Sequence, residues 1–247
     1  MSIKRILLEN ALNLRSFLLT GKKSKKEVVL NAKRILHIKG QNNKDFLGIN
    51  QWDNLKNRCS SCQRCRLWQT RYLGVFGSGN PDSLLWLVGE APGAEEDAKG
   101  LPFVGDAGKL LTKMLQAIEI NREDVFITNL LKCRPPENRN PNSDEILACT
   151  PYLKEQISLK KPKIILALGK FASSYFLQKE GSLSSFRGQT YEHNGVIILP
   201  TFHPSALLRN EKWKYPAWED LKKLKQILLS YDFYSKSENS QKPKKNT

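Results

Sequence analysis

The chain has no long apolar segment, few acidic residues and only three histidines. No run of about 18 apolar residues occurs, which argues against a membrane-spanning helix. Near the N-terminus, Lys4 and Arg5 precede an apolar stretch, as in a signal peptide. Polar residues such as Glu9 and Arg15 interrupt that stretch, and no small-residue cleavage site follows it. We therefore expect a cytoplasmic protein that has no membrane partner.

The shortage of acidic residues leaves a large positive charge. Forty Lys and Arg residues face 24 Asp and Glu residues, so the formal net charge is +16. A surplus of this size favours a polyanionic partner, with DNA or RNA first. Part of it lies near the ends, around residues 22–26 and 242–245, so a basic tail on an otherwise neutral protein stays an alternative.

The ends of the 247-residue chain differ in composition from its middle. Residues 1–54 are expected to form a basic, partly helical extension, because apolar residues recur at helical spacing before Gly21. Residues 233–247 are rich in Lys, Ser and Asn and are expected to be a disordered basic tail. The middle, residues 55–232, is long enough for one domain with its own core.

Short apolar runs alternate with helical patterns in the middle of the chain. The expected strands are Leu84–Val88, Val125–Thr128, Ile164–Leu168 and Val196–Leu199. Helices are expected after Gly108 and over residues 143–159, 170–178 and 217–230. This alternation predicts an α/β fold, a three-layer α/β/α sandwich with a central, mostly parallel four-stranded sheet.

Unusual loops follow three of the expected strands. They are Gly89–Gly93, Asn129–Pro136 and Thr201–Pro204. In parallel sheets, ligands bind beyond the carboxyl ends of the strands, so three such loops on one rim indicate a single site. The alternative is that their Gly and Pro residues only form turns.

Five cysteines are expected to be reduced in a cytoplasmic protein. Cys59, Cys62 and Cys65 are three residues apart, whereas Cys133 and Cys149 are distant. One C-x-x-C pair and the two distant residues make four thiolates, a set that suits zinc or a [4Fe–4S] cluster. Ordinary buried cysteines are the alternative, and the spacing does not decide between them.

Three strings of residues together resemble the family 4 uracil-DNA glycosylases, the iron–sulfur-containing type. The strings are Gly89–Gly108 (GEAPGAEEDAKGLPFVGDAG), Asn129–Pro136 (NLLKCRPP) and Phe202–Asn210 (FHPSALLRN). The match runs from about Cys62 to Asn210, in the order and spacing of the family. The resemblance thus covers most of the middle of the chain and supports a uracil-DNA glycosylase-like fold.

The resemblance implies an enzyme that flips uracil out of DNA and hydrolyses its N-glycosidic bond. The product is an abasic site, and the reaction is the first step of base excision repair. Uracil-containing DNA is the implied partner, and we expect a monomer. Two alternatives remain open: a non-catalytic iron–sulfur protein that binds nucleic acid in replication or repair, and a nucleotide-processing α/β enzyme.

The resemblance also selects among the cysteines. It implies that Cys62, Cys65, Cys133 and Cys149 are the ligands of a [4Fe–4S] cluster. Cys59 falls outside the family's pattern, and it is either a bystander or a competing ligand.

Substrate binding is assigned to five residues by the same resemblance. The amide of Asn129 both donates and accepts, which matches N3–H and O4 of uracil. Phe103 is expected to stack on the flipped base, and Glu96 to shape the wall that excludes the C5 methyl group of thymine. The backbone at Glu90 and Ala91 is expected to line the pocket. The alternatives are a turn former for Asn129 and core packing for Phe103.

The histidine motif is assigned catalysis and DNA contact. His203 is expected to donate a hydrogen bond to uracil O2 as negative charge develops there. Leu207 and Leu208 are expected to fill the vacated stack, with Arg209 on a phosphate. The alternatives are a structural histidine and an ordinary first turn of a helix.

Two positions depart from related enzymes. Ala91 stands where family 1 uracil glycosylases carry an Asp, and the sequence offers no obvious general base in its place. Asp106 stands where family 4 members usually have Arg, which removes a positive charge near the expected DNA face.

Overall fold

The computed structural model describes residues 50–234. The helix predicted before Gly21 and most of the predicted tail lie outside these residues. Helix α3 (Gln51–Ser60) begins ahead of the predicted boundary at residue 55 and packs against α6 (Ser143–Lys160). Within the described range, no helix is long and apolar enough to cross a membrane.

A six-stranded sheet forms the centre of the described chain, in the order β1-β3-β2-β4-β6-β5. Its strands are β1 (Ser78–Gly79), β2 (Leu85–Gly89), β3 (Phe126–Asn129), β4 (Ile164–Leu168), β5 (Tyr191–His193) and β6 (Val196–Thr201). The four inner strands are parallel and are the four that the sequence predicts. The sheet is wider than the predicted four strands, because β1 and β5 add short antiparallel edges.

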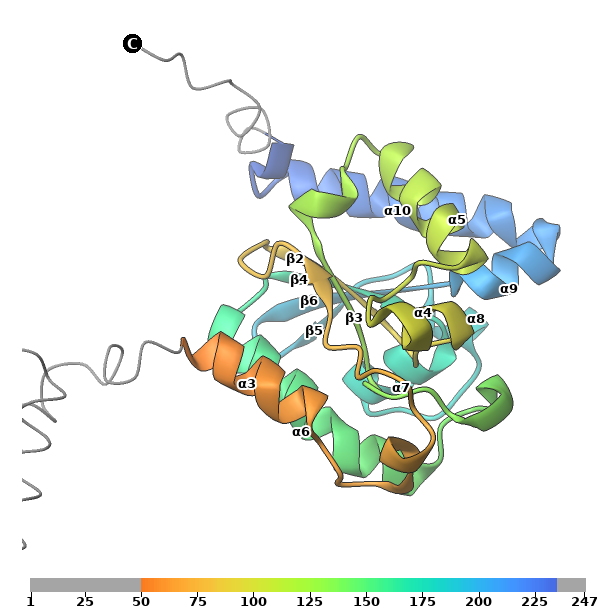
Figure 1. Cartoon of the computed structure of the whole chain (residues 1–247). Helices are drawn as coiled ribbons and strands as arrows, with labels where there is room; N and C mark the ends of the chain where they lie inside the picture. The colour runs from red at the N-terminus through yellow and green to blue at the C-terminus, as the bar shows by residue number, and fades with distance from the viewer. Residues whose placement is uncertain (1–49, 235–247) are drawn as a thin grey trace, which may run out of the picture. The chain divides into compact units, whose positions relative to one another are not determined.

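The inner strands are apolar on both faces because helices cover both faces (Figure 1). Leu85 and Leu87 of β2 join a core cluster with residues of α5 (Asp106–Gln116) and α10 (Lys214–Leu229). Trp86 and Val88 point the other way and pack with residues of α6 and α7 (Lys170–Leu177). This strict alternation follows from the two-residue period of a strand. The predicted three-layer α/β/α sandwich is confirmed.

The predicted helices correspond to α5, α6, α7 and α10. The remaining short elements are α4 (Ala94–Lys99), α8 (Leu183–Phe186), α9 (Pro204–Arg209), η1 (Arg66–Gln69), η2 (Arg122–Asp124), η3 (Pro136–Asn138) and η4 (Glu211–Trp213). Gly108 lies inside α5 instead of before it, and a Cβ there would lie 1.8 Å from the carbonyl oxygen of Phe103. A glycine is therefore needed for α5 to pack against the Phe103 loop.

Candidate functional site

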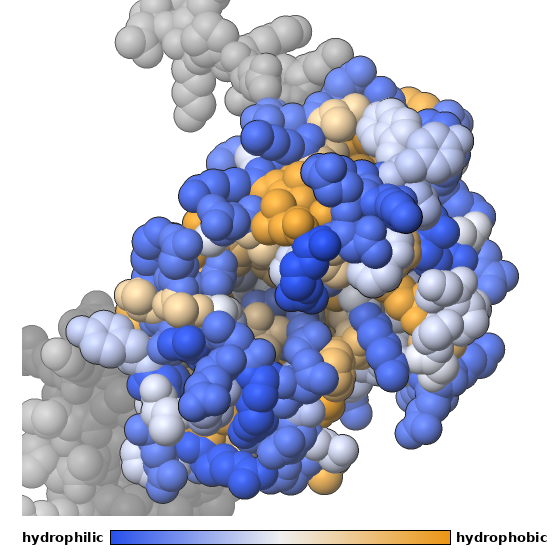
Figure 2. Space-filling model, turned by 90° about the vertical axis from the view of Figure 1, so that its right-hand side faces the viewer, coloured by the Kyte–Doolittle hydropathy of each residue, from blue (hydrophilic) through white to orange (hydrophobic). Residues whose placement is uncertain are grey.

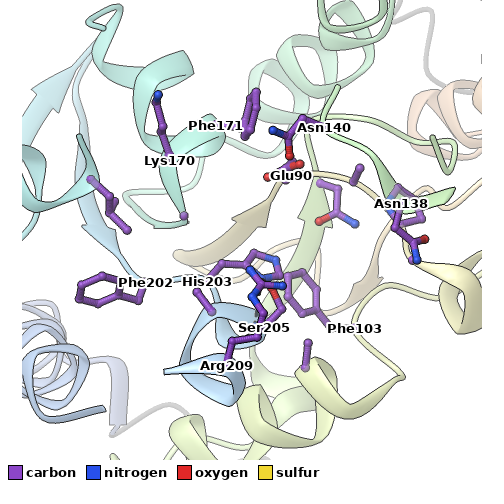
Figure 3. A pocket seen from close by; sticks show the side chains of 18 of the residues that line it. Glu90, Phe103, Asn138, Asn140, Lys170, Phe171, Phe202, His203, Ser205 and Arg209 are labelled. Atoms are coloured by element: carbon purple, nitrogen blue, oxygen red, sulfur yellow. Dashed lines mark hydrogen bonds between the residues drawn. The ribbon is translucent and has the colours of Figure 1, made fainter. Parts of the chain in front are cut away.

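A cavity of about 720 Å³ opens at the carboxyl ends of the parallel strands (Figure 3). All three predicted loops contribute to its lining, through Glu90, Asn129 and His203 among others. Two segments that the sequence did not indicate line it as well, residues 138–140 and the start of α7. The prediction that the three loops share one rim is confirmed.

Asn129 ends β3 and is buried in the wall of this cavity. Its side-chain Oδ1 has no hydrogen-bond partner among the described residues. Leaving such an acceptor unpaired costs about 1–3 kcal/mol, so the amide is set up for a donor that is not part of the fold. Gly89, its partner on β2, gives it room, because a Cβ there would lie 2.5 Å from Asn129 Oδ1.

Phe103 lies beside Asn129 in a strained backbone conformation. Its φ of 52° is in the left-handed region, which is rare for an aromatic residue. A Cβ on Gly89 would lie 2.6 Å from Phe103 Cζ, so this ring approaches the end of β2 closely. Its centroid is 5.4 Å from that of the His203 ring, at an angle of 33°. Both rings line the cavity.

His203 caps the N-terminus of α9, and this position fixes its tautomer. Its Nδ1 accepts a hydrogen bond from the Ser205 backbone N–H at 3.2 Å and lies 2.8 Å from Ser205 Oγ. Because a backbone N–H only donates, Nδ1 carries the lone pair and the proton of the neutral ring is on Nε2. Burial, and to a lesser degree the charge of Arg209, lowers the pKa of His203 to about 4. At neutral pH the ring is therefore an uncharged N–H donor.

Two carboxylates line the cavity, and their roles differ. Glu96 accepts backbone hydrogen bonds from Val104 at 2.8 Å, from Gly105 at 2.9 Å and from Gly93 at 3.1 Å. Its carboxylate therefore ties the start of α4 to the loop before α5.

The carboxylate of Glu90, by contrast, makes no hydrogen bond to another described residue. Burial raises the pKa of Glu90 to about 7, and the charge of Arg209 opposes that rise. Neighbouring Ala91 also lines the cavity, as predicted. The prediction for Glu90 concerned only its backbone, so the position of its carboxyl group is a finding of the structure.

The two leucines that were expected to contact DNA are adjacent residues of helix α9, but they lie in different environments. Leu207 is 2% exposed and packs in the core with α5 and α10, so its expected insertion into DNA is corrected. Leu208, on the next position of the helix, is 49% exposed, and Arg209 lines the cavity. The helical period turns adjacent residues about 100° apart, and for this reason only one of the pair reaches the surface.

All five cysteines line a second, smaller cavity, called the cysteine cavity below. None of them forms a disulfide. Three of their sulfur atoms accept hydrogen bonds: Cys133 from Arg71 Nη1 at 3.0 Å, Cys149 from the backbone N–H of residue 132 at 3.2 Å, and Cys62 from that of residue 64 at 3.4 Å. Burial raises the pKa of the Cys149 thiol to about 12. Within residues 50–234, no group of three or more His, Cys, Asp or Glu side chains is arranged to hold a metal ion.

The profile of the Uracil DNA glycosylase superfamily matches residues 76–222, more than half of the chain. The chain belongs to the uracil-DNA glycosylase superfamily. The matched residues include β2, β3, β4 and β6, and with them every loop of the large cavity.

Curated relatives place the chain more closely within that superfamily. The type-4 uracil-DNA glycosylase of Sulfurisphaera tokodaii is 43% identical over 192 residues, which cover 74% of this chain and 87% of the relative. The type-4 enzyme of Saccharolobus solfataricus is 45% identical over 187 residues, 72% of this chain and 87% of its own length. That of Thermotoga maritima is 43% identical over 178 residues, 70% and 93% of the two chains. The predicted resemblance to family 4 is confirmed.

Lys132 is a residue of this uracil-DNA glycosylase fold that sequence reasoning missed. Its side chain is fully buried, and Nζ donates to Thr128 Oγ1 at 2.5 Å, to the Asn129 carbonyl oxygen at 2.8 Å and to Gln156 Oε1 at 2.8 Å. It also lines the cysteine cavity. A lysine between the apolar Leu131 and Cys133 was the available indication. Lys132 therefore connects the cysteine cavity with the backbone of Asn129.

The side of the molecule that carries α8 and α9 is mostly hydrophilic, with separate hydrophobic patches (Figure 2). Asp106 is at the start of α5 and forms an ion pair with Lys109 at 2.8 Å. Both side chains are exposed, so the pair contributes little to stability. Lys109 thus keeps a positive charge next to Asp106.

Proposed function

We propose that this protein is a DNA glycosylase that removes uracil from DNA as the first step of base excision repair. The observation that carries this proposal is the buried, unpaired Oδ1 of Asn129 in the wall of the cavity at the strand ends, called the base cavity from here on. A flipped uracil has an N3–H donor for that oxygen and an O4 acceptor for the Asn129 amide N–H. Cytosine has the opposite pattern, an acceptor at N3 and a donor at N4, so the same amide orientation rejects it.

Stacking and shape supplement this hydrogen-bond pattern. Phe103, held close to the end of β2, is proposed to stack on the face of the flipped base. Glu96 is proposed to act through the loop that it ties together, because its three backbone hydrogen bonds fix the wall between Gly93 and Gly105. A fixed wall next to C5 excludes the methyl group of thymine.

Bond cleavage is proposed to rely on stabilisation of the leaving group. As the N1–C1′ bond breaks, its electron pair moves into the uracil ring and negative charge builds on O2. His203 is neutral at neutral pH and has its proton on Nε2, so its Nε2–H is suited to donate a hydrogen bond to O2. A preorganised donor of this kind is typically worth about 10²–10³ in rate.

Glu90 is proposed to activate the attacking water. It is the cavity carboxylate that accepts no hydrogen bond from a described residue, and its raised pKa of about 7 suits a general base near neutral pH. Water adds to C1′, its proton passes to the Glu90 carboxylate, and the uracil anion leaves with its charge stabilised by His203. This role compensates for Ala91, which cannot supply the acid of family 1 enzymes.

Cys62, Cys65, Cys133 and Cys149 are proposed to hold a [4Fe–4S] cluster. Support comes from the donor set: the sulfurs line one cavity, three of them receive N–H hydrogen bonds, and Arg71 and Lys132 offset thiolate charge. The cluster would join the segment after α3, the loop after β3 and helix α6. Its role is structural, since the base cavity has its own catalytic groups. Cys59 lines the same cavity and is proposed to be a bystander.

Contact with DNA is proposed to involve Leu208 and Arg209, which lie at the end of α9. Exposed Leu208 is suited to fill the space of the flipped base, and Arg209 to hold a phosphate. The net charge of +16 favours the same partner. A monomeric state and a cytoplasmic location stay predictions.

An excision assay tests the proposal directly. Purified protein is incubated with a labelled oligonucleotide that contains one uracil, and the abasic product is cleaved with heat and alkali. We expect cleavage at uracil in single-turnover conditions and none at cytosine or thymine in the same sequence. Tight binding of the uracil oligonucleotide without any abasic product would instead support the non-catalytic nucleic-acid-binding protein.

A further inference from the structure

Trp213 forms the outer member of a stack of planar groups beside the base cavity. Its indole lies on the Phe202 ring, with centroids 5.1 Å apart and planes at 11°. The Arg187 guanidinium lies over the same Phe202 ring, 5.3 Å from its centroid. Phe202 is buried, whereas Trp213 is 40% exposed. The indole therefore has one face held by Phe202 and presents part of its surface to solvent.

Hydrogen bonds hold Arg187, the cationic member of this stack, in place. Arg187 donates to both carboxylate oxygens of Asp220, at 3.0 Å and 2.9 Å, and Asp220 also accepts from Thr201 Oγ1 at 2.8 Å. Thr201 ends β6 and directly precedes Phe202 in the chain. The Phe202 ring on which the Trp213 indole lies is thus anchored next to the end of β6, and a pre-positioned stack reduces the entropy lost when a partner binds to it.

Trp213 lines the same cavity as Asn129 and His203, yet the proposed reading of uracil leaves it without a role. Figure 3 shows Phe202 well apart from Phe103 and Asn138, at another end of the cavity. A cavity of about 720 Å³ is also within the range that takes drug-sized ligands, more than one pyrimidine needs. A second flat group therefore has space next to the flipped base.

Basic residues occur near Trp213, in the cavity lining and in the neighbouring part of the chain. Arg209 lines the cavity, Lys212 and Lys214 flank Trp213 in the chain, and Lys214 forms an ion pair with Glu211 at 2.6 Å. Two more exposed aromatic residues follow in α10, Tyr215 and Trp218. Aromatic side chains interleaved with lysines are the pattern by which proteins hold single-stranded nucleic acid.

We propose that Trp213 is a stacking platform for an unpaired nucleobase next to the target uracil, so that the enzyme favours uracil in single-stranded DNA. In an intact duplex, the bases next to the flipped base stay paired and stacked on the rest of the helix, and Leu208 is proposed to fill the gap between them, so their faces are covered. An unpaired base has a free face and can continue the Phe202–Trp213 stack. The inference rests on the proposed function, because it places the target uracil in the adjoining part of the cavity.

Fluorescence of 2-aminopurine tests the platform independently of catalysis. The full-length protein is titrated into single-stranded oligonucleotides that carry a non-cleavable 2′-fluorinated deoxyuridine and 2-aminopurine on its 5′ or 3′ side. We expect the wild-type protein to quench one of the two probes by stacking. We expect Trp213→Leu, which keeps apolar contact with Phe202, to lose that quenching and to bind the single strand about tenfold more weakly. Duplex binding should stay within twofold of wild type.

Two further variants complete the design. Trp213→Phe should retain part of the quenching, because it keeps an aromatic face, and Tyr72→Ala is the matched control for loss of an exposed aromatic ring. No quenching in wild-type protein, or equal weakening of single-strand and duplex binding by Trp213→Leu, would overturn the platform. Uracil excision by the same preparations is measured in parallel, so that failure of the platform and failure of the proposed glycosylase are told apart.

Discussion

The base cavity and the cysteine cavity meet at one short segment, Asn129–Cys133, and they are built in opposite ways. In the base cavity, the key polar atoms are left without internal partners: Asn129 Oδ1 is unpaired and the Glu90 carboxylate makes no hydrogen bond within the described chain. In the cysteine cavity, sulfur atoms receive hydrogen bonds from Arg71 and from the backbone. Free polar groups suit a ligand that enters and leaves, whereas satisfied ones suit a permanent part of the structure.

The largest expected effects come from removing the proposed cluster ligands of the cysteine cavity. Cys62→Ala, Cys133→Ala and Cys149→Ala should each lose the bound iron and lower the thermal midpoint strongly, because the variant chain loses a covalent link between distant segments. Anaerobically purified wild-type protein should contain about four irons and four sulfides per chain, by colorimetric assay.

Cys59→Ala is the matched control, since Cys59 lines the same cavity but lies outside the ligand set. It should keep its iron and its brown colour. A colourless wild-type protein with one zinc would refute the cluster, and iron loss in Cys59→Ala would show that the ligand set includes this residue.

Of the variants at the two groups proposed to act on the breaking bond, Glu90 and His203, Glu90→Gln should have the larger effect. Removing a general base costs about 10²–10⁴ in single-turnover rate. Since burial raises the pKa of Glu90 to about 7, the wild-type rate should fall as the pH drops below that value, and Glu90→Gln should lose this acid limb. In the unfolded chain, Glu90 has its ordinary pKa of 4.5. The unfolded state therefore loses this proton at a lower pH than the folded state, and folding stability falls as the pH rises from 4.5 towards 7.

The exposed Glu95→Gln serves as the control for Glu90, and it should keep the wild-type profile. A pH profile in Glu90→Gln with an unchanged acid limb would remove Glu90 from the role of base.

His203→Ala should slow excision by about 10²–10³, the usual effect of removing one donor to a developing anion. DNA binding should change little, because phosphate contacts carry most of it. His203→Asn should recover part of the rate, since an amide also donates. His193→Ala, on the edge strand β5, is the matched histidine control. Near-normal excision by His203→Ala would assign the leaving group to another donor.

Lys132→Met should have the smallest effect on rate and should affect both cavities. It removes the shared ammonium group and leaves the Asn129 carbonyl oxygen and Gln156 Oε1 without that donor. We expect about 1–3 kcal/mol lower stability towards urea, a partial loss of iron, and a fall in excision of less than about tenfold. The exposed Lys113→Met is the control. If Lys132→Met lost excision but kept its iron content and its stability towards urea, Lys132 would act on the base cavity alone.

The inner sheet and the site loops were predictable because they rest on local patterns. Continuous apolar runs identify strands covered on both faces, and polar or Gly-rich loops at their carboxyl ends identify a rim. The edge strand β5 was missed, although Asn194-Gly195, both at positive φ, join it to β6 in the turn that a hairpin of this kind favours. Strand β1 has only two residues and leaves no periodic pattern.

Side-chain direction was the least predictable feature. Sequence strings do not show that Leu207 turns into the core while Leu208 turns out, because both are leucines in one short helix. They also do not show that the Glu96 carboxylate accepts three backbone hydrogen bonds while that of Glu90 accepts none from a described residue. These outcomes depend on tertiary contacts between the loops, and the buried position of Lys132 does so too.

The account depends most on the claim that the unpaired amide of Asn129 reads uracil. The measurement is single-turnover excision by Asn129→Ala, with salt-dependent DNA binding by the same protein. The matched control is Asn57→Ala, at an exposed position of α3 outside both cavities. We predict that Asn129→Ala loses excision by about 10³ or more while DNA affinity stays near wild type, and that Asn57→Ala excises almost normally. Excision by Asn129→Ala within tenfold of wild type, or an equal loss of excision and DNA binding, would contradict the account.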